Sequence, residues 1–452
     1  MVLSNRGPLS FALGDGGDLS ARRGAGGLVS GLTPLVEGSG ALWMAAAISD
    51  GDREAAARGV VDAEGLRVRL LALDEGTYRA AYDVVCNATL WFAHHGLFDA
   101  ARRPRLDRRW REAWLAYRDV NEAFAKAAAE SAPEDAAVLV QDYHLCLVAP
   151  ALRAARPDLR LVHFSHTPFA TPEWLRALPD EAAVELLRGL AAHHACAFHT
   201  ERWADAFVAC CRAHGVVPPA TAATPLPADA GDLAMTAASP ACVAGGAELD
   251  DAVGDRRVIV RVDRVELSKN LLRGFHAYDL LLEEHPEWRE QVVFVAYVYP
   301  SREGLPEYLA YRNEVENLIE RVNKRWATPT WTPVIYDAGD DFPRSVAALQ
   351  RADVFLVNPI RDGLNLVAKE GVLVNERDGV LVLSTEAGAW DEIGSAGAVG
   401  INPFDVAATA DAIHAALSMP PQERARRSAS LRAAVAARTP ADWLADQLAL
   451  VD

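Results

Sequence analysis

Residues 354–370 read VFLVNPIRDGLNLVAKE, and this stretch decides the fold. Its first four residues form an apolar run that is typical of a buried strand, and its end has the pattern of a helix. A strand that leads directly into a helix is the repeating unit of α/β sheets, in which ligands bind where the strands end. The polar residues of the turn therefore lie where a ligand would be held; they are Arg361, Asp362, Gly363 and Asn365.

The turn after this strand suits a ligand that carries both phosphate and hydroxyl groups. Its backbone N–H groups and the N-terminus of the following helix favour a phosphate. Asp362 adds a carboxylate that accepts hydrogen bonds from hydroxyl groups. We expect Glu370 to lie about two helical turns inside the helix and to reach a second polar group of the same ligand. Together these features indicate a sugar nucleotide.

The composition argues against several classes of protein. The chain has 452 residues, of which 51% are hydrophobic, so we expect two domains with large cores. The net charge of −17, without a long run of Lys or Arg, argues against nucleic acid and anionic membranes as partners.

We find no signal peptide and no apolar run long enough to span a bilayer. The six cysteines have no metal-binding spacing, and we expect reduced thiols in a cytoplasmic protein. Because the chain opens almost inside its first strand, we also expect that some N-terminal residues are missing from it.

Short apolar runs alternate with helical patterns, which indicates an α/β fold with parallel sheets. Strands are predicted at residues 2–4, 138–141, 159–164, 257–262, 292–297, 354–357 and 380–383. Residues 218–254 are rich in Ala, Pro and Gly and are predicted to be a linker with a short helix or two. We therefore expect two doubly wound, Rossmann-like domains that face a cleft, formed by residues 1–228 and 229–435. The last helix, at about residues 436–452, is expected to pack back on the first domain.

Two helices are predicted in more detail. The last helix is expected to begin with Thr439 as its cap and Pro440 at its first position. The helix at residues 271–284 has an apolar face, which a helix on a sheet requires. That face consists of Leu271, Phe275, Tyr278 and Leu282.

Three basic residues that follow predicted strands are candidate phosphate ligands. Arg6 ends the first strand, and a guanidinium group matches a phosphate bidentately. Arg264 and Lys269 flank the turn after the strand at 257–262. Most Lys and Arg side chains are simply solvated, but two cations just before a helix N-terminus are better explained as a diphosphate clamp. A charge-assisted hydrogen bond contributes about 1.5–3 kcal/mol, enough for roughly tenfold in rate if it strengthens in the transition state.

Two more strand ends and one helical segment carry polar or aromatic residues. Asp142 can bind sugar hydroxyls or act as a base, and His166 follows the next strand. His163 and His166 have a spacing seen in metal sites, but no third ligand matches them, so no metal is predicted. Tyr82 and Trp91 have an irregular helical spacing and are most simply packing residues.

Together these pieces resemble trehalose-6-phosphate synthases, which are retaining glycosyltransferases of the two-Rossmann-domain (GT-B) architecture. The resemblance covers nearly the whole chain, and it depends on the order and spacing of the motifs rather than on any one of them. The motifs are Gly26-Gly27-Leu28; Tyr82, Asn87 and Leu90-Trp91; Asp142-Tyr143-His144; His166-Thr167-Pro168-Phe169; Arg264 with Ser268-Lys269; Ser301-Arg302; Trp331-Thr332-Pro333; and the opening run through Lys369-Glu370.

The resemblance implies glucose transfer from a nucleoside-diphosphate glucose to glucose 6-phosphate, giving α,α-trehalose 6-phosphate. The implied ligands of the acceptor phosphate are Arg6, Tyr82, Trp91 and Arg302, with Asp142 orienting the acceptor sugar. The implied donor ligands are Gly27 by its backbone; His166 and Asp362 at the glucose hydroxyls; Arg264 and Lys269 at the diphosphate; the loop Gly363, Leu364, Asn365, Leu366 and Val367; and Glu370 at the ribose. The catalytic set among these is Arg264, Lys269, Asp142 and Asp362.

The resemblance implies neither a cofactor nor a metal ion, because the nucleotide sugar is a substrate. It implies a separate phosphatase that removes the product phosphate, and it is compatible with a homo-oligomer. UDP-glucose and GDP-glucose both remain open as donors, with ADP-glucose less favoured.

Some positions depart from the usual pattern of this family. The usual Leu-Asp-Tyr before Ser268 is Val265-Glu266-Leu267, and the usual Gly after Lys269 is Asn270, which can still adopt a left-handed conformation. Two alternatives therefore stay open. One is a related synthase with another phosphorylated acceptor, such as a glucosylglycerol-phosphate synthase or a pseudo-glycosyltransferase. The other is a non-catalytic sugar-phosphate-binding subunit, which the intact cations and carboxylates disfavour.

Overall fold

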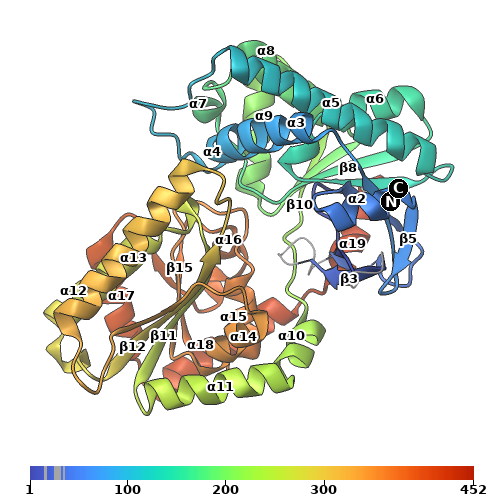
Figure 1. The fold of residues 1–452 in the computed structure, drawn as a ribbon. Coiled ribbons are helices and arrows are strands. Elements are labelled where there is room, and N and C mark those ends of the chain that lie inside the picture. Colours follow the sequence, from blue (N-terminus) through green and yellow to red (C-terminus); the bar gives the residue numbers. More distant parts are fainter. Residues whose placement is uncertain (15–17, 25–31, 34–35, 452) are drawn as a thin grey trace. The chain divides into compact units, whose positions relative to one another are not determined.

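The chain folds into two compact units, each with its own parallel sheet (Figure 1). This computed structural model describes residues 1–14, 18–24, 32–33 and 36–451. Unit 1 consists of Met1–Leu226 and Pro440–Asp452, and unit 2 of Pro227–Thr439. The α/β class predicted from the alternation of apolar runs and helical patterns is confirmed.

Unit 1 contains a sheet whose strand order is β10-β9-β8-β7-β1-β4-β6-β5. Every neighbouring pair in it is parallel except β5 with β6. Its strands are β1 (Val2–Leu3), β4 (Leu42–Ala46), β5 (Val60–Ala63), β6 (Leu66–Leu71), β7 (Ala137–Gln141), β8 (Arg160–Ser165), β9 (Ala195–Phe198) and β10 (Ala220–Ala223).

A separate antiparallel hairpin, β2 (Leu9–Leu13) with β3 (Leu19–Arg23), follows the first strand. Neither of these strands was among those predicted from the sequence. The alternation of apolar and polar residues in β2 is short, and only its pairing with β3 makes it a strand.

The helices of unit 1 lie between these strands, and the longest of them, α5, packs against α3, η1 and α6. They are α2 (Asp50–Ala57), α3 (Glu75–Arg79), η1 (Ala80–Leu90), α4 (Trp91–His95), α5 (Arg108–Ser131), η2 (Tyr143–Leu145), α6 (Val148–Ala155), α7 (Pro172–Leu175), α8 (Asp180–Ala191), α9 (Glu201–Ala213) and α19 (Pro440–Ala449). The start of α19 at Pro440 agrees with the predicted cap. Trp443 of α19 is fully buried and donates its indole N–H to the carbonyl of Thr224 at 3.0 Å.

Unit 2 contains an all-parallel sheet with the strand order β13-β12-β11-β14-β15-β16. Its strands are β11 (Arg257–Val265), β12 (Val292–Pro300), β13 (Val334–Asp337), β14 (Val354–Val357), β15 (Val380–Ser384) and β16 (Val399–Ile401). The central strands are buried along nearly their whole length, as expected for a parallel sheet covered on both faces.

Helices cover both faces of this sheet, with α12, α13 and α17 on one face and α11, α14, α15 and α18 on the other (Figure 1). The helical elements of unit 2 are α10 (Ala230–Ala237), α11 (Pro240–Val253), η3 (Leu267–Lys269), α12 (Leu271–Glu284), η4 (Pro286–Trp288), α13 (Pro306–Trp326), α14 (Phe342–Arg351), α15 (Val367–Val374), α16 (Gly388–Ile393), η5 (Gly394–Ala396), α17 (Val406–Leu417) and α18 (Pro421–Ala436). Residues 218–254 contain two helices, α10 and α11, in agreement with the predicted short helix or two, but the prediction of a linker is wrong for α11, which packs on α14 as an integral helix of unit 2.

The predicted apolar face of residues 271–284 is confirmed. The helix α12 has these bounds, and its four predicted face residues, Leu271, Phe275, Tyr278 and Leu282, are fully buried.

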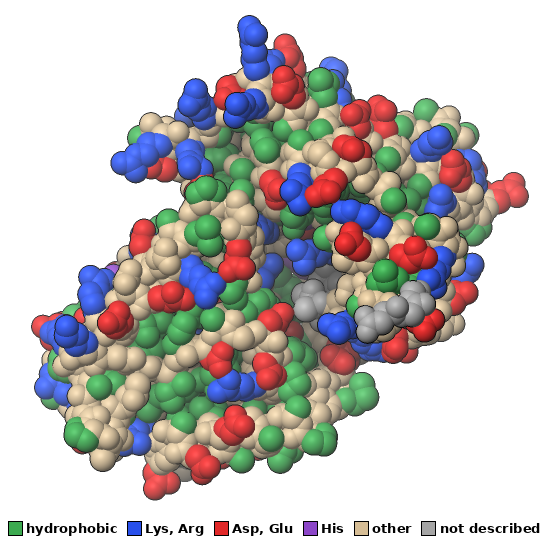
Figure 2. Space-filling view, in the orientation of Figure 1, with side chains coloured by type: hydrophobic (Ala, Val, Ile, Leu, Met, Phe, Trp, Pro, Cys, Tyr) green, Lys and Arg blue, Asp and Glu red, His purple; other side chains and the backbone are tan. Residues whose placement is uncertain are grey.

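The surface is charged without a patch of one sign on the face drawn in Figure 2, where acidic and basic side chains are interspersed. The six cysteines are all buried and none of them forms a disulfide, as the sequence predicted. Among the described helices, none is long and apolar enough to cross a bilayer.

Candidate active site

The strand order of unit 2 reverses between β11 and β14. The chain runs from β11 through β12 to β13 and then returns to the other side of β11. In open α/β sheets, ligands bind beyond the carboxyl ends of the strands at such a point. The segment after β11 and the segment after β14 meet there, because the Ile360 N–H donates to the carbonyl of Ser268 at 2.8 Å. The two predicted donor segments are thus neighbours in the structure.

Lys269 lies between two carboxylates at this point. Its Nζ is 2.6 Å from Asp362 Oδ2 and 3.6 Å from Asp263 Oδ1. Burial acts to lower the pKa of Lys269, but the two carboxylates outweigh it and raise that pKa. Burial also raises the pKa of Asp263, in spite of the neighbouring Lys269 and Arg261. The ammonium group therefore stays charged in a place with little water.

A buried framework supports this group of charges. Arg261 is fully buried, with its guanidinium 3.1 Å from Asp263 Oδ2 and bonded to the carbonyl of Lys269. Asn270 adopts the left-handed conformation that the sequence allowed there, with φ +60°, and its side chain donates to the carbonyl of Asn358 at 3.0 Å. Arg261 and Asp263 were not predicted from the sequence. They could have been found as charged residues in a largely apolar strand, because a buried charge must be paired.

Arg264, the second-last residue of the same strand, shares a partner with Arg302. Arg264 Nη1 is 3.1 Å from Glu266 Oε1, and Arg302 Nη1 is 2.7 Å from the same oxygen. The Arg264 side chain is 45% exposed, so its guanidinium faces solvent on one side. Glu266 raises the pKa of Arg264, which keeps this guanidinium charged.

The loop between β14 and α15 is held from behind by α16. Gly388 N–H donates to the carbonyl of Asp362 at 3.2 Å, and Ala389 N–H donates to that of Leu364 at 2.8 Å. Asn365 has φ +75°, and its side-chain amide donates to Asp362 Oδ2 at 3.3 Å. Since α15 begins at Val367, the backbone N–H groups of residues 366–368 are those that a helix start leaves without an intrahelical acceptor.

Glu370 lies in the first turn of α15. The prediction that it lies about two turns inside the helix is wrong, because the loop after β14 stays irregular until Leu366. Burial raises the pKa of Glu370 to about 7, with a smaller contribution from the nearby Asp232. The influence of Asp232 indicates that Glu370 lies near α10, which packs against α15.

Unit 1 has a second reversal of strand order, between β1 and β7. Arg6 follows β1 and is exposed, and Asp142 follows β7. Asp142 has φ +66° and ψ 173°, a region that residues with a side chain rarely adopt. Its Oδ1 accepts a hydrogen bond from the backbone N–H of His166 at 3.1 Å. The two neighbouring strand ends, of β7 and β8, are thereby joined through a carboxylate.

His166 is bonded to the end of β7 a second time. Its Nε2 lies 2.9 Å from Gln141 Oε1, and burial lowers the pKa of His166 to about 3. The imidazole is therefore neutral at physiological pH and acts through hydrogen bonds rather than through charge.

Tyr82 and Trp91 lie on a helix that changes its winding. The segments α3, η1 and α4 are continuous, and η1 is a π-helix, whose hydrogen bonds run from residue i to residue i+5. The N–H of Trp91, for example, donates to the carbonyl of Cys86. This wider winding explains the spacing that was irregular for an α-helix.

The two aromatic residues have different surroundings. Tyr82 is half-buried, and its ring stacks on Tyr78 and His144 at centroid distances of 5.5 and 5.8 Å. Trp91 is only 2% exposed and stacks on His95 at 4.2 Å. Of these two predicted phosphate ligands, Tyr82 is thus the more accessible within unit 1.

The predicted site residues divide between the units. Arg302 belongs to unit 2, whereas Arg6, Tyr82 and Trp91 belong to unit 1. The structure brings Arg264, Lys269, Asp362 and the loop up to Glu370 together, and it brings Asp142 and His166 together. The predicted Gly27 lies outside the described residues.

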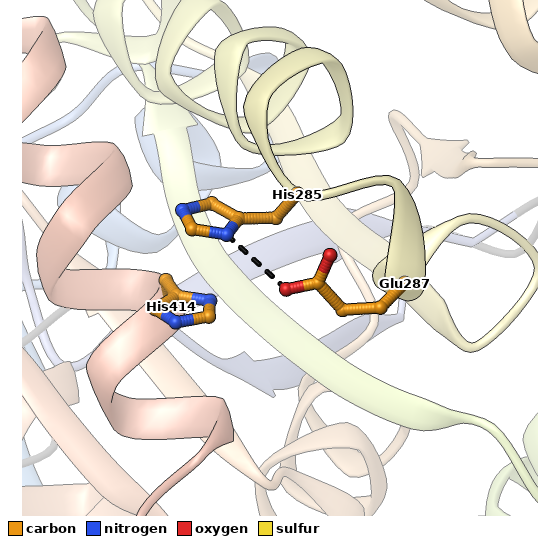
Figure 3. Close-up of side chains that lie close together, drawn as sticks. All are labelled: His285, Glu287 and His414. Carbon is orange, nitrogen blue, oxygen red and sulfur yellow. Dashed lines mark hydrogen bonds and ion pairs between the residues drawn. The ribbon is translucent and has the colours of Figure 1, made fainter.

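One group among the described residues is spaced like metal ligands: His285, Glu287 and His414, with ligand atoms within 4.8 Å of one another (Figure 3). His285 Nδ1 is 3.2 Å from Glu287 Oε1, and the two imidazole rings stack at 3.7 Å with 11° between their planes. Trp288 donates its indole N–H to His414 Nδ1 at 3.0 Å, which occupies the single lone pair of a neutral imidazole. Parallel rings also do not direct their lone pairs toward one point.

This cluster lies at the opposite end of α12 from Lys269, about 20 Å away for a helix of this length. Its contacts join the C-terminal end of α12 to α17. It is therefore a packing contact, separate from the candidate site.

The chain matches the family model of glycosyltransferase family 20 over residues 1–451. A trehalose-6-phosphate synthase of Mycolicibacterium vanbaalenii is 33% identical, with 98% of this chain and 94% of that protein covered. A bifunctional trehalose-6-phosphate synthase/phosphatase of Thermoproteus tenax is 34% identical over 84% of this chain, which spans about half (53%) of the length of that relative.

Solved structures are similar over almost the whole chain. An alpha,alpha-trehalose-phosphate synthase (UDP-forming) from Burkholderia xenovorans, in complex with glucose-6-phosphate, has a TM-score of 0.86 at 29% identity and covers 99% of this chain and 98% of its own. An E. coli structure bound with UDP-2-fluoro glucose has a TM-score of 0.86 at 28% identity, covering 99% and 97%. The fold is therefore shared with proteins whose solved structures contain a UDP-glucose analogue or glucose-6-phosphate.

Proposed function

Because the chain belongs to glycosyltransferase family 20, we propose that it transfers glucose from a nucleoside-diphosphate glucose to glucose 6-phosphate. The products are α,α-trehalose 6-phosphate and a nucleoside diphosphate. The observation that carries this proposal is the group formed by Arg264, Lys269 and Asp362 at the strand reversal of unit 2. It places two cations for a diphosphate beside a carboxylate for sugar hydroxyls.

The donor ligands proposed in unit 2 follow from this group. Arg264 and Lys269 bind the diphosphate, helped by backbone N–H groups at the start of α15. Asp362, held by Lys269 and Asn365, accepts hydrogen bonds from the glucose hydroxyls. Glu370 accepts from the ribose. The loop residues Gly363, Leu364, Leu366 and Val367 contribute backbone groups, and in unit 1 we propose the same for Gly27 and a hydroxyl contact for His166.

The acceptor ligands proposed in unit 1 lie at the other reversal. Asp142 orients the acceptor sugar, while Arg6 and Tyr82, with the more buried Trp91, bind its phosphate. We propose the same ligand role for Arg302 of unit 2, whose guanidinium is already oriented by Glu266.

The proposed reaction retains the anomeric configuration. The anomeric hydroxyl of glucose 6-phosphate attacks C1 of the donor glucose on the face from which the diphosphate leaves. The bond from C1 to the diphosphate oxygen breaks, and that oxygen takes the proton of the attacking hydroxyl. Arg264 and Lys269 stabilise the negative charge that develops on the leaving group, which is where fixed charges accelerate such a reaction most.

We propose that this step needs no metal ion. Metal ions commonly stabilise a leaving diphosphate by charge. Here two side chains with raised pKa values, Arg264 and Lys269, supply positive charge at the same place. Support also comes from the chemistry of the ligands, because the carboxylates Asp263 and Asp362 are already paired with two cations, Arg261 and Lys269.

UDP-glucose is the donor we propose to test first, since solved relatives of this chain are UDP-forming or bind a UDP-glucose analogue. Six buried cysteines without a disulfide support our proposal of a reducing, cytoplasmic location. The product carries a phosphate ester, so a phosphatase reaction must follow if free disaccharide is to form.

The test is incubation with glucose 6-phosphate and UDP-, GDP- or ADP-glucose, with both products identified by mass. Trehalose 6-phosphate is expected, and its absence with every donor would contradict the proposal.

The Arg264→Ala variant should lose about tenfold to 100-fold in kcat, because a charge-assisted contact to the leaving group is removed. Glycerol 3-phosphate in place of glucose 6-phosphate tests the alternative acceptor. Calorimetric binding of UDP without turnover would instead favour a non-catalytic subunit.

A further inference from the structure

One buried carboxylate oxygen holds both arginines of unit 2 that are proposed to bind phosphate. Glu266 Oε1 lies 2.7 Å from Arg302 Nη1, 3.1 Å from Arg264 Nη1 and 3.0 Å from the hydroxyl of Ser301. The Glu266 side chain is 2% exposed, so this contact is made with little water between the groups. A single anion therefore joins the ends of two neighbouring strands.

The strand register explains why these residues meet. β11 and β12 are parallel, with Val265 opposite Pro300 at the end of the ladder. Glu266 and Ser301 are the next residues along the two strands, and so they come opposite each other just beyond the sheet. Arg302 then turns back with φ +47°, a left-handed conformation that a residue with a side chain adopts only when its surroundings hold it.

Two guanidinium groups on one oxygen would otherwise repel each other. Arg302 acts to lower the pKa of Arg264, and Glu266 more than offsets this effect. Arg302 is also held by Tyr308, whose hydroxyl is 3.2 Å from Nη1. The arginine side chains are therefore ordered before any ligand arrives, which reduces the rotamer freedom that binding would remove.

We propose that Glu266 is a positioning residue, which sets Arg264 and Arg302 in place for the phosphate groups of the two substrates. This inference rests on the proposed function for the identity of those substrates. Glu266 touches neither the sugar nor the reacting atoms, and it acts through the two arginines.

The direction in which phosphate binding changes when Glu266 is removed distinguishes this role from a purely electrostatic effect. A buried anion repels phosphate, so its removal would strengthen phosphate binding if charge alone mattered. Under the positioning role, removal weakens binding, because the arginines lose their fixed orientation.

The experiment compares two variants of the full chain. Glu266→Gln keeps the shape but loses the charge, whereas Glu266→Asp keeps the charge on a shorter side chain. We expect Glu266→Gln to raise the KM of both substrates, and the Kd of UDP and of glucose 6-phosphate, by about tenfold. The KM and Kd values should rise less in Glu266→Asp than in Glu266→Gln. If Glu266 acted by packing alone, they would rise less in Glu266→Gln, because Gln fills the same volume as Glu.

The matched control is Glu303→Gln. Glu303 pairs with Arg312 at 2.8 Å on the surface of the same segment. Removing the charge of Glu303 should leave the KM and Kd values of both substrates unchanged. Ser301→Ala is the milder variant in case Glu266→Gln does not fold. It removes the hydroxyl that donates to Oε1 and should raise both Kd values about threefold.

Failure of this inference is distinguishable from failure of the proposed function. Wild-type protein that forms no trehalose 6-phosphate contradicts the proposed function, while the UDP and glucose 6-phosphate titrations still measure the positioning effect. Unchanged or tighter binding in Glu266→Gln, or in Ser301→Ala where the former does not fold, overturns the inference. Wild-type protein that binds neither ligand overturns both.

Discussion

Asp142 keeps a backbone conformation that costs free energy, with φ +66° and ψ 173°. Its surroundings hold it there, since its carbonyl lies 3.1 Å from His163 Nε2 and its Oδ1 accepts from the N–H of His166. Conformations of this kind are concentrated at functional sites. The strain at the end of β7 is therefore consistent with the proposed orientation of the acceptor by Asp142.

Replacing Asp142 should separate stability from activity. Asp142→Gly is expected to be more stable than Asp142→Ala by about 1–3 kcal/mol, because only glycine adopts this conformation without strain. Both variants should lose glucose transfer by about 100-fold or more, since the acceptor is no longer oriented. Urea unfolding and product formation are the measurements. Equal stability of the two variants would contradict the assignment of strain.

Glu370 gives a prediction about pH. Its pKa in the folded state is about 7, against 4.5 for the ordinary group, because burial disfavours the charged form. Between these pH values the folded state binds a proton that the unfolded state has released, so this contribution to stability falls as the pH rises from 4.5 to about 7.

Glu370→Gln removes this contribution. The unfolding free energy of the wild type minus that of Glu370→Gln should decrease as the pH rises from 4.5 to about 7 and stay constant above it. Urea unfolding at a series of pH values measures the difference. A constant difference across this range would show that the pKa of Glu370 is not raised.

At the scale of elements, the loop after β14 depends on a close approach by α16. A Cβ atom on Gly388 would lie 1.9 Å from the carbonyl oxygen of Gly363, far inside van der Waals contact. Only glycine at this position lets the N-terminus of α16 bond to the backbone of Asp362 and Leu364. The shape of the proposed donor loop is thus set by a residue more than twenty positions further along the chain.

Gly388→Ala should move the loop and weaken donor binding. We expect a loss of about 1–3 kcal/mol in stability from overpacking and a rise of about tenfold in the KM of the donor. Gly246→Ala is the control, because its Cβ would meet only the side chain of Ala347 at 3.9 Å in a helix of the same unit. Unchanged donor KM in Gly388→Ala would show that the loop tolerates the displacement.

At the scale of the whole molecule, the strand order reverses in each unit, and residues of the proposed site follow the strands at both reversals. The chain has a net charge of −17, yet the residues proposed to bind anionic substrates include Arg6, Arg264, Lys269 and Arg302. Local positive charge, rather than the overall charge, therefore decides which ligands bind.

Removal of metal ions tests the charge assigned to these side chains. Dialysis against EDTA should leave the rate of glucose transfer within about twofold of the untreated protein, because fixed cations already neutralise the leaving diphosphate. Recovery of lost activity by Mg²⁺ or Mn²⁺ would contradict this expectation. Activity of untreated protein is the reference.

Much of the fold could be predicted from local patterns. The bounds of β14 and α12 are those read from the sequence, because an apolar run between turn residues and an apolar helical face are both local signals. The β2–β3 hairpin and the π-helix η1 were missed, since the pairing of short strands and the winding of a helix depend on neighbours in space. The predicted position of Glu370 within its helix was wrong for the same reason, because the loop before α15 takes its shape from contacts with α16.

Local sequence patterns were enough to predict the two-sheet architecture, the strand ends that carry polar residues, and the motifs typical of the family to which the chain belongs. Which charged residues are partners became known from the tertiary structure. Lys269 and Asp362 are 93 residues apart in the chain but 2.6 Å apart in space, and Glu266 meets Arg302 across 36 residues. Pairing of charges depends on distance and on exclusion of water, and both arise only when separate strands are aligned in a sheet.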